Sequence, residues 1–159
     1  MAAILERMQE RLDLLQRTRS IAIVGMSKNS SRSSHFVATY LAGSTDFEVY
    51  YVNPRETEIM GKPVYASLAD LPVVPDMVDV FRRVDDLPAV TDEAIAVGAT
   101  SVWFQLGLEH PDAAVTAVAA GLDVVQNRCL KIEHARFRGG LHTAGFNTGV
   151  IDSRRARLV

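Results

Sequence analysis

The sequence is poor in sulfur and has no long apolar run. One cysteine, Cys129, occurs in 159 residues, so the chain cannot form an internal disulfide or supply a thiolate metal cluster. A single thiol is typical of a reducing compartment, and we expect a cytoplasmic protein. Residues 1–19 carry charged side chains among the apolar ones, so we expect neither a signal peptide nor a membrane span there.

The sequence also lacks a strong charge of either sign and any familiar catalytic pattern. A formal net charge of -2 predicts no nucleic-acid partner and no binding to anionic membranes, so an anion site needs a local cluster of basic residues. The patterns H-E-x-x-H, C-x-x-C and G-x-S-x-G are missing. We therefore expect no metal site and no enzyme activity. The histidines are scattered along the chain: His35, His110, His134 and His142.

What the chain does contain is a regular alternation of apolar runs and helical patterns. The length and the 48% apolar content suit one domain with one core. Alternating strands and helices predict an α/β fold with a doubly wound, mainly parallel, Rossmann-like sheet in three layers. Strands are expected at 21–24, 47–52, 63–65, 77–81, 101–104 and 124–125. Helices are expected from Ser33 or Ser34 to Gly43, at 85–97 and at 111–120, the first with a buried stripe of Phe36, Val37, Tyr40 and Leu41.

Both ends of the chain lie outside this alternation. Residues 1–19 predict an extra amphipathic helix, with Ile4, Leu5, Met8, Leu12 and Leu15 at helical spacing. It would pack on its own domain or on a second copy. Residues 20–135 form the expected Rossmann-like domain, and the glycine-rich, basic residues 136–159 predict a tail.

The turn after the first strand, from Gly25 to Ser34, predicts a phosphate-binding loop. In open α/β sheets, ligands bind beyond the carboxyl ends of the strands, where the strand order reverses. Gly25 permits close approach of the backbone, Lys28 and Arg32 supply positive charge, and the following helix presents free N–H groups. Hydroxyl donors come from Ser27, Ser30, Ser33 and Ser34. The alternative is an ordinary Gly-Ser turn.

The second strand ends differently from that of an NAD-binding protein. The fingerprint G-x-G-x-x-G is absent, and Asn53-Pro54-Arg55 stands where an acidic residue would hold the ribose hydroxyls. Arg55 suits a ribose phosphate, as in NADP or coenzyme A, or is an ordinary surface charge. The local chemistry therefore disfavours NAD.

Several short segments, taken in order, resemble one known family. These are Val24-Gly25-Met26-Ser27, Val52-Asn53-Pro54, Gly61-Lys62-Pro63-Val64-Tyr65, Asp79-Val80-Phe81-Arg82, Val102-Trp103-Phe104-Gln105-Leu106-Gly107 and Asn127-Arg128-Cys129. Over about residues 20–134 the chain resembles the small, free-standing CoA-binding proteins, whose fold is that of the CoA-binding domain of the succinyl-CoA synthetase α subunit. The resemblance implies coenzyme A or an acyl-CoA as ligand.

The resemblance also implies roles for individual residues. The loop would cradle the phosphates, Asn53 and Pro54 would line the adenosine side, and Phe81 with Arg82 would face the pantetheine or pyrophosphate. Phe81 and Trp103 are alternatively core residues, and Gln105 is the better candidate contact at its strand end. The candidate site residues are Gly25, Met26, Ser27, Lys28, Ser30, Arg32, Ser33, Ser34, Asn53, Pro54, Arg55, Phe81, Arg82 and Gln105.

The expected function is that of a non-catalytic binding or regulatory protein for CoA or an acyl-CoA, acting alone, as a homodimer or with a partner enzyme. Two alternatives remain. One is an NADP-dependent oxidoreductase, for which the chain shows no Tyr-x-x-x-Lys pattern. The other is an interaction subunit of a larger enzyme that has lost its ligand. Cys129 is either a small core residue or a thiol that exchanges with CoA.

Overall fold

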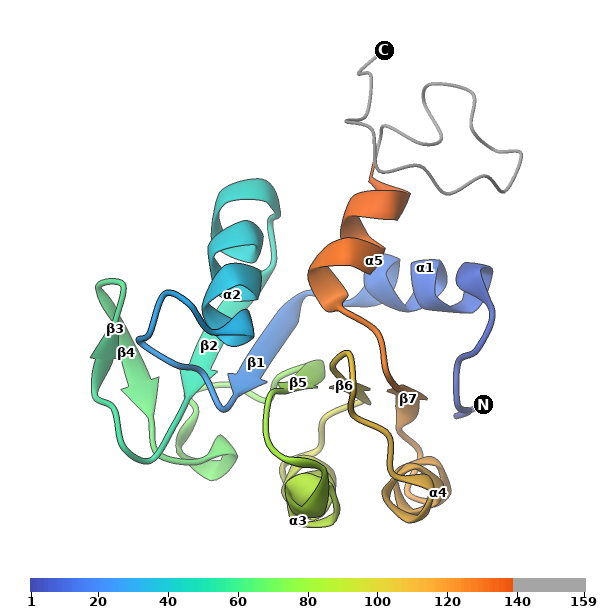
Figure 1. The fold of residues 1–159 in the computed structure, drawn as a ribbon. Helices are drawn as coiled ribbons and strands as arrows, with labels where there is room; N and C mark the ends of the chain where they lie inside the picture. The colour runs from blue at the N-terminus through green and yellow to red at the C-terminus, as the bar shows by residue number, and fades with distance from the viewer. Residues whose placement is uncertain (139–159) are drawn as a thin grey trace.

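The computed structural model describes residues 1–138, which form a seven-stranded sheet flanked by helices (Figure 1). The strand order is β3-β4-β2-β1-β5-β6-β7, and each pairing is parallel except β3 with β4. The strands are β1 (Ser20–Val24), β2 (Glu48–Val52), β3 (Glu58–Ile59), β4 (Lys62–Tyr65), β5 (Met77–Val80), β6 (Ser101–Phe104) and β7 (Asp123–Val125). The helices are α1 (Met8–Arg17), α2 (Ser33–Ser44), α3 (Leu87–Val97), α4 (Pro111–Ala119) and α5 (Leu130–Phe137), with single 3-10 turns η1 (Leu68–Asp70) and η2 (Val84–Asp86).

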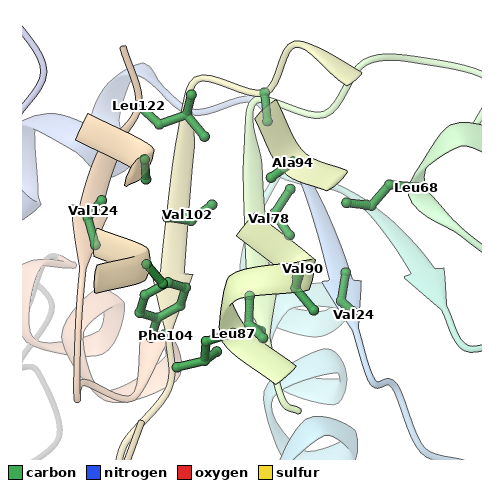
Figure 2. Packing of buried hydrophobic residues seen from close by; sticks show 14 of the residues in the cluster. Val24, Leu68, Val78, Leu87, Val90, Ala94, Val102, Phe104, Leu122 and Val124 are labelled. Atoms are coloured by element: carbon green, nitrogen blue, oxygen red, sulfur yellow. The ribbon is translucent and has the colours of Figure 1, made fainter. Parts of the chain in front are cut away.

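The helices divide between the two faces of the sheet, which confirms the doubly wound, three-layer α/β fold. Strands β1, β5 and β6 are buried at every position because helices cover both of their faces. On one face, Val78, Val102 and Phe104 pack with Leu87 and Val90 of α3 (Figure 2). On the other face, a second cluster joins the sheet to α1, α2 and α5.

The N-terminal segment differs from the predicted helix over residues 1–19. Ile4 and Leu5 are extended beside β7: the N–H of Leu5 donates to the Val124 carbonyl (2.7 Å) and the N–H of Val124 donates to the Ala3 carbonyl (2.9 Å). The helix begins only at Met8, which is 37% exposed. The helical spacing of Ile4 and Leu5 was therefore coincidental, because pairing with β7 determines their backbone.

Helix α2, which follows the Gly25 loop, begins and ends close to the predicted positions, but its buried face is different. Phe36 is 54% exposed, whereas Val37, Ala38 and Leu41 are buried. The prediction of Phe36 in the core was wrong, because the face of α2 that packs on the sheet carries Val37, Ala38 and Leu41. Ser44 is the last helical residue.

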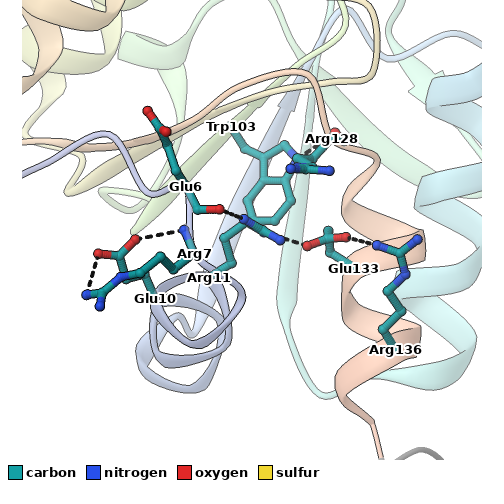
Figure 3. A network of polar contacts seen from close by, with 8 residues as sticks. All are labelled: Glu6, Arg7, Glu10, Arg11, Trp103, Arg128, Glu133 and Arg136. Atoms are coloured by element: carbon teal, nitrogen blue, oxygen red, sulfur yellow. Dashed lines mark hydrogen bonds and ion pairs between the residues drawn. The ribbon is translucent and has the colours of Figure 1, made fainter. Parts of the chain in front are cut away.

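Helix α5 was not predicted, since its sequence is mostly polar. It extends to Phe137, two residues into the range assigned to the tail. The buried carboxylate of Glu133 accepts a hydrogen bond from Nε of Arg11 (2.5 Å) and another from Nη1 of Arg136 (2.7 Å), which fastens α5 to α1 (Figure 3). Residues 139–159 lie outside the described part. No helix within residues 1–138 is long and apolar enough to cross a membrane.

Candidate functional site at the carboxyl edge of the sheet

The strand order reverses at β1, whose neighbours are β2 on one side and β5 on the other. The segments that follow these three strands begin at Gly25, Asn53 and Phe81, so they meet at one edge of the sheet. This is the position at which doubly wound folds bind ligands. The sequence-predicted candidates from three separate segments are thus brought together.

The backbone conformation and the close packing at this edge require a glycine at position 25. Its φ of +88° lies in the left-handed region, and a Cβ added there would stand 2.8 Å from the Phe81 carbonyl oxygen. The N–H groups of Gly25 and Met26 both donate to the carbonyl of Val52 (3.0 and 3.3 Å). The turn therefore passes tightly between the ends of β2 and β5.

The loop after Gly25 is shaped by its own side chains. The Ser34 hydroxyl accepts a hydrogen bond from the N–H of Ser27 (3.0 Å), and the Ser27 hydroxyl accepts one from the N–H of Asn29 (3.0 Å). Asn29 Oδ1 in turn accepts one from the N–H of Ser31 (2.9 Å). Ser34 is buried, so its hydroxyl holds the loop in shape instead of capping the helix, where Arg32 is the N-cap. Such turns built on Ser and Asn side chains fix a loop without further packing.

These contacts leave a set of backbone donors without acceptors. Within residues 1–138, the N–H groups of Lys28, Ser30, Ser33 and Ser34 have no hydrogen-bond partner. Ser33 and Ser34 form the first turn of the twelve-residue helix α2, whose N-terminus carries positive partial charge. This arrangement of free N–H groups before a helix suits an anion such as a phosphate group.

The basic side chains of the site are exposed to solvent. Lys28 is 72% exposed and its Nζ lies 3.7 Å from Oε1 of Glu56. Arg82 is 40% exposed and its Nε lies 3.5 Å from Oδ2 of Asp86. Arg32 and Arg55 are exposed as well. Exposed ion pairs of this length contribute little to stability, so these cations are free to turn toward an anionic ligand.

Asn53 is a positioning residue within this edge. Its Nδ2 donates to the Met26 carbonyl (2.8 Å), and its Oδ1 accepts from the N–H of Arg55 (2.8 Å). The backbone N–H of Asn53 donates to the Tyr65 carbonyl (2.9 Å). The side chain therefore connects the loop after Gly25 to the end of β2, and its amide is not free for a ribose.

A hollow of about 200 Å³ opens beside the loop, between the ends of β1 and β2 and helix α3. Four of its lining residues, Val24, Val52, Pro54 and Arg82, come from segments that were singled out in the sequence. The others were not predicted, because they come from the segment after β4, from the turn before α3 and from α3 itself, and only the fold brings these together. These remaining lining residues are Ala66, Ser67, Leu68, Asp86, Ala89, Val90 and Glu93.

Two predicted contacts have buried side chains. The side chain of Met26 is fully buried in the core, so only its backbone faces the loop. Gln105 is 5% exposed: its Nε2 donates to Oδ1 of Asp79 (2.5 Å), and its Oε1 accepts from the N–H of Leu130 (3.4 Å). Gln105 thus connects β5, β6 and the start of α5.

Asp79 is a fully buried acid that was not predicted as a site residue. Burial raises its pKa to about 8, opposed by the hydrogen bond from Gln105. Its Oδ2 has no hydrogen-bond partner among the described residues. The carboxyl is therefore largely protonated at neutral pH.

The aromatic candidates differ in exposure. Trp103 is fully buried and its Nε1 donates to the Arg128 carbonyl (2.9 Å), which makes it a core residue. Phe81 is half-buried and packs at the border of the cluster on the α2 face, as does Cys129. Both side chains are therefore partly accessible to solvent, although neither lines the hollow beside α3.

A larger groove of about 760 Å³ lies at the opposite, amino-terminal edge of the sheet. It is lined by the ends of α1, α2 and α5 and includes Leu12, Phe47, His134 and Phe137. It has neither a glycine turn nor a helix N-terminus, so we do not assign the nucleotide site to it. Among residues 1–138, no group of three or more His, Cys, Asp or Glu side chains could hold a metal ion.

Comparison with known proteins finds similar chains of similar length. YneT of Bacillus subtilis, an uncharacterised protein, is 34% identical over 123 residues, covering 77% of this chain and 90% of the relative. A hypothetical protein from Pyrococcus horikoshii has a solved structure with a TM-score of 0.81 and 33% identity, covering 87% of this chain and 99% of that one.

A third likeness concerns the fold alone. The dinucleotide-forming acetyl-coenzyme A synthetase 1 of Candidatus Korarchaeum cryptofilum has a TM-score of 0.64 at 23% identity, covering 71% of this chain and 27% of that one. The family model described as a CoA binding domain matches residues 19–135, almost the whole of the sheet and its helices. This chain therefore belongs to the CoA-binding domain family.

Proposed function

We propose that this protein binds coenzyme A or an acyl-CoA at the carboxyl edge of its sheet, and that it acts as a binding or regulatory protein without catalysing a reaction. The observation that carries the proposal is the Gly25 turn, which leads into free N–H groups at the start of α2. Family membership supplies the class of nucleotide.

The pyrophosphate would lie against the loop. The N–H groups of Lys28, Ser30, Ser33 and Ser34 supply neutral donors, and Lys28 and Arg32 supply charge. Glu56 draws Lys28 aside in the free protein. A bound phosphate would replace Glu56 as the partner of Lys28, because it carries more charge.

The adenosine would lie in the hollow beside α3. Val24, Val52 and Leu68 offer an apolar surface to a purine ring, and the Glu93 carboxylate can accept a hydrogen bond from its amino group. Arg82, at the mouth of this hollow, is placed to meet a phosphate on the ribose. This ribose phosphate is present in CoA and absent from NAD.

Thermal unfolding of the full chain with CoA, NADPH, NAD and ATP tests the proposal. A ligand that binds only the folded state raises the melting temperature. A shift with CoA that NAD and ATP do not match supports the proposal. A shift with NADPH alone would favour the oxidoreductase alternative, and no shift with any of the four would favour an interaction subunit without ligand.

A further inference from the structure

The segment after β5 carries Arg82, whose side chain lies between the two halves of the candidate site. Its Cδ lies 3.1 Å from the point that a Cβ on Gly25 would occupy, so its methylene groups pass against the Gly25 turn. Arg82 also lines the hollow beside α3, and its side chain is 40% exposed. The guanidinium is therefore close both to the loop, where we expect the pyrophosphate, and to the hollow, where we expect the adenosine.

This guanidinium already has an anionic partner in the free protein. Nε of Arg82 lies 3.5 Å from Oδ2 of Asp86, which lines the same hollow. No other ion pair among residues 1–138 involves either side chain. A separation of 3.5 Å is longer than that of a strong charge-assisted hydrogen bond, so a better acceptor can replace the carboxylate.

The carboxylate of Asp86 is not used to cap helix α3. Asp86 occupies the N-cap position, where an aspartate side chain commonly accepts a hydrogen bond from the first turn of the helix. Here the backbone of Asp86 is in the right-handed helical region (φ −87°, ψ −10°), because the turn η2 continues into α3, and its side chain makes no capping bond. The ion pair and the missing cap together indicate that this carboxylate interacts with Arg82 and not with the helix.

We propose that Asp86 is a specificity-determining residue of the CoA site, because it competes with the phosphate on the ribose of CoA for Arg82. The inference rests on the proposed function. A phosphate monoester carries about two negative charges at neutral pH and has several acceptor oxygens, so it displaces the single, distant carboxylate. A ligand without this phosphate, such as dephospho-CoA or NAD, meets Arg82 still paired with Asp86 and gains no contact from it.

Titration calorimetry of the full chain with CoA and dephospho-CoA tests this competition, since the two ligands differ only in the ribose phosphate. Asp86→Asn keeps the shape of the side chain and removes the competing charge. Exposed ion pairs are weak, so the affinity for CoA should rise by about two- to fivefold, and the affinity for dephospho-CoA should stay the same.

Arg82→Gln should remove most of the difference in affinity between the two ligands. Adding Asp86→Asn to that variant should change the affinity for CoA no further, because there is no longer a cation to compete for. A residue that only stabilised the start of α3 would not alter the ratio of the two affinities. An equal gain from Asp86→Asn with and without Arg82 would therefore contradict the competition.

Glu56→Gln is the matched control. It removes the same charge from the other ion pair of the site, in which Oε1 of Glu56 lies 3.7 Å from Nζ of Lys28. Both ligands contain the pyrophosphate that we expect at Lys28, so this variant should change the two affinities by the same factor. If Asp86→Asn changes the ratio of affinities no more than Glu56→Gln does, or if it weakens CoA binding, Asp86 does not compete for Arg82 and the inference is wrong.

Failure of the proposed function gives a different result. If the wild type binds neither CoA nor dephospho-CoA, and neither ligand raises its melting temperature, the proposed function fails together with the inference. If the wild type binds CoA but Asp86→Asn leaves the ratio of the two affinities unchanged, the inference alone is wrong and the proposed function stands.

Discussion

At the scale of single residues, Gly25 is the position where the fold and the candidate site depend most directly on the same atoms. Its positive φ and the 2.8 Å approach of the Phe81 carbonyl exclude any side chain. Backbone strain for a residue with a Cβ is about 1–2 kcal/mol in this region, and the contact with Phe81 adds to it.

Gly25→Ala should therefore lower the free energy of unfolding by about 2 kcal/mol or more and abolish CoA binding. Gly43→Ala is the matched control, because Gly43 is helical and nothing lies within 4 Å of an added Cβ. That variant should be neutral, or more stable by up to about 1 kcal/mol. Urea unfolding measures both changes, and equal stability of the two variants would contradict the role of Gly25.

Asp79 should make stability depend on pH. Its pKa is raised from 3.8 to about 8 in the folded state, so between these values the folded protein holds a proton that the unfolded chain has lost. Stability therefore decreases as pH rises through this window, with a slope of up to about 1.4 kcal/mol per pH unit, and levels off above pH 8.

Asp79→Asn removes this titration while keeping an oxygen for the hydrogen bond from Gln105. Relative to the wild type, the variant should gain stability steadily from pH 6 to pH 8. Urea unfolding at several pH values measures the difference. Parallel curves for the two proteins across this range would show that Asp79 does not titrate as the structure indicates.

At the scale of elements, α5 is held by a buried ion pair as well as by the apolar side chain of Leu130. Arg11 and Glu133 are 122 positions apart in sequence and both are buried. No periodic pattern in either segment reveals such a pair, which is why α5 was missed. In α1, the expected apolar stripe included Leu15 but not Leu14, although both are buried. Six of the seven strands, by contrast, could be predicted: β1 and β6, for example, are buried on both faces and their sequences are almost continuously apolar. The two-residue strand β3 was not predicted.

Breaking this pair should be much more harmful than replacing it. Glu133→Leu leaves the Arg11 guanidinium buried without its carboxylate, and we expect a loss of about 3–5 kcal/mol in the free energy of unfolding. The double variant with Arg11→Met and Glu133→Leu removes both charges and should recover most of that loss. Urea unfolding of the single and double variants measures the coupling. Additive losses would mean that the two side chains do not act as a pair.

At the scale of the whole molecule, the site is assembled where three distant segments meet. The sequence predicted the phosphate loop, because Gly25, its serines and its cations are contiguous. It did not predict the hollow, whose lining comes from β1, β2, the segment after β4 and α3. It also placed Gln105 and Met26 among the ligand contacts, although neighbours distant in sequence enclose their side chains.

Two basic side chains of the Gly25 loop lie on the surface of the fold, away from the sheet. Lys28 and Arg32 are exposed and make no contact that supports the sheet, so reversing both charges should leave the melting temperature of the free protein nearly unchanged. The same change places two carboxylates where the phosphates of CoA are expected to bind. We expect at least about a tenfold rise in the dissociation constant, with a weaker dependence on salt than in the wild type.

The matched control combines Arg7→Glu with Arg19→Glu, which changes the net charge by the same amount at positions just before α1 and just before β1, away from the loop. Titration calorimetry at two salt concentrations distinguishes local from global electrostatics. If the loop variant alone loses affinity, the phosphates lie at the loop. If both variants lose affinity equally, the overall charge of the protein governs binding and the loop has no special part. Unchanged affinity in both would place the CoA phosphates elsewhere on the molecule.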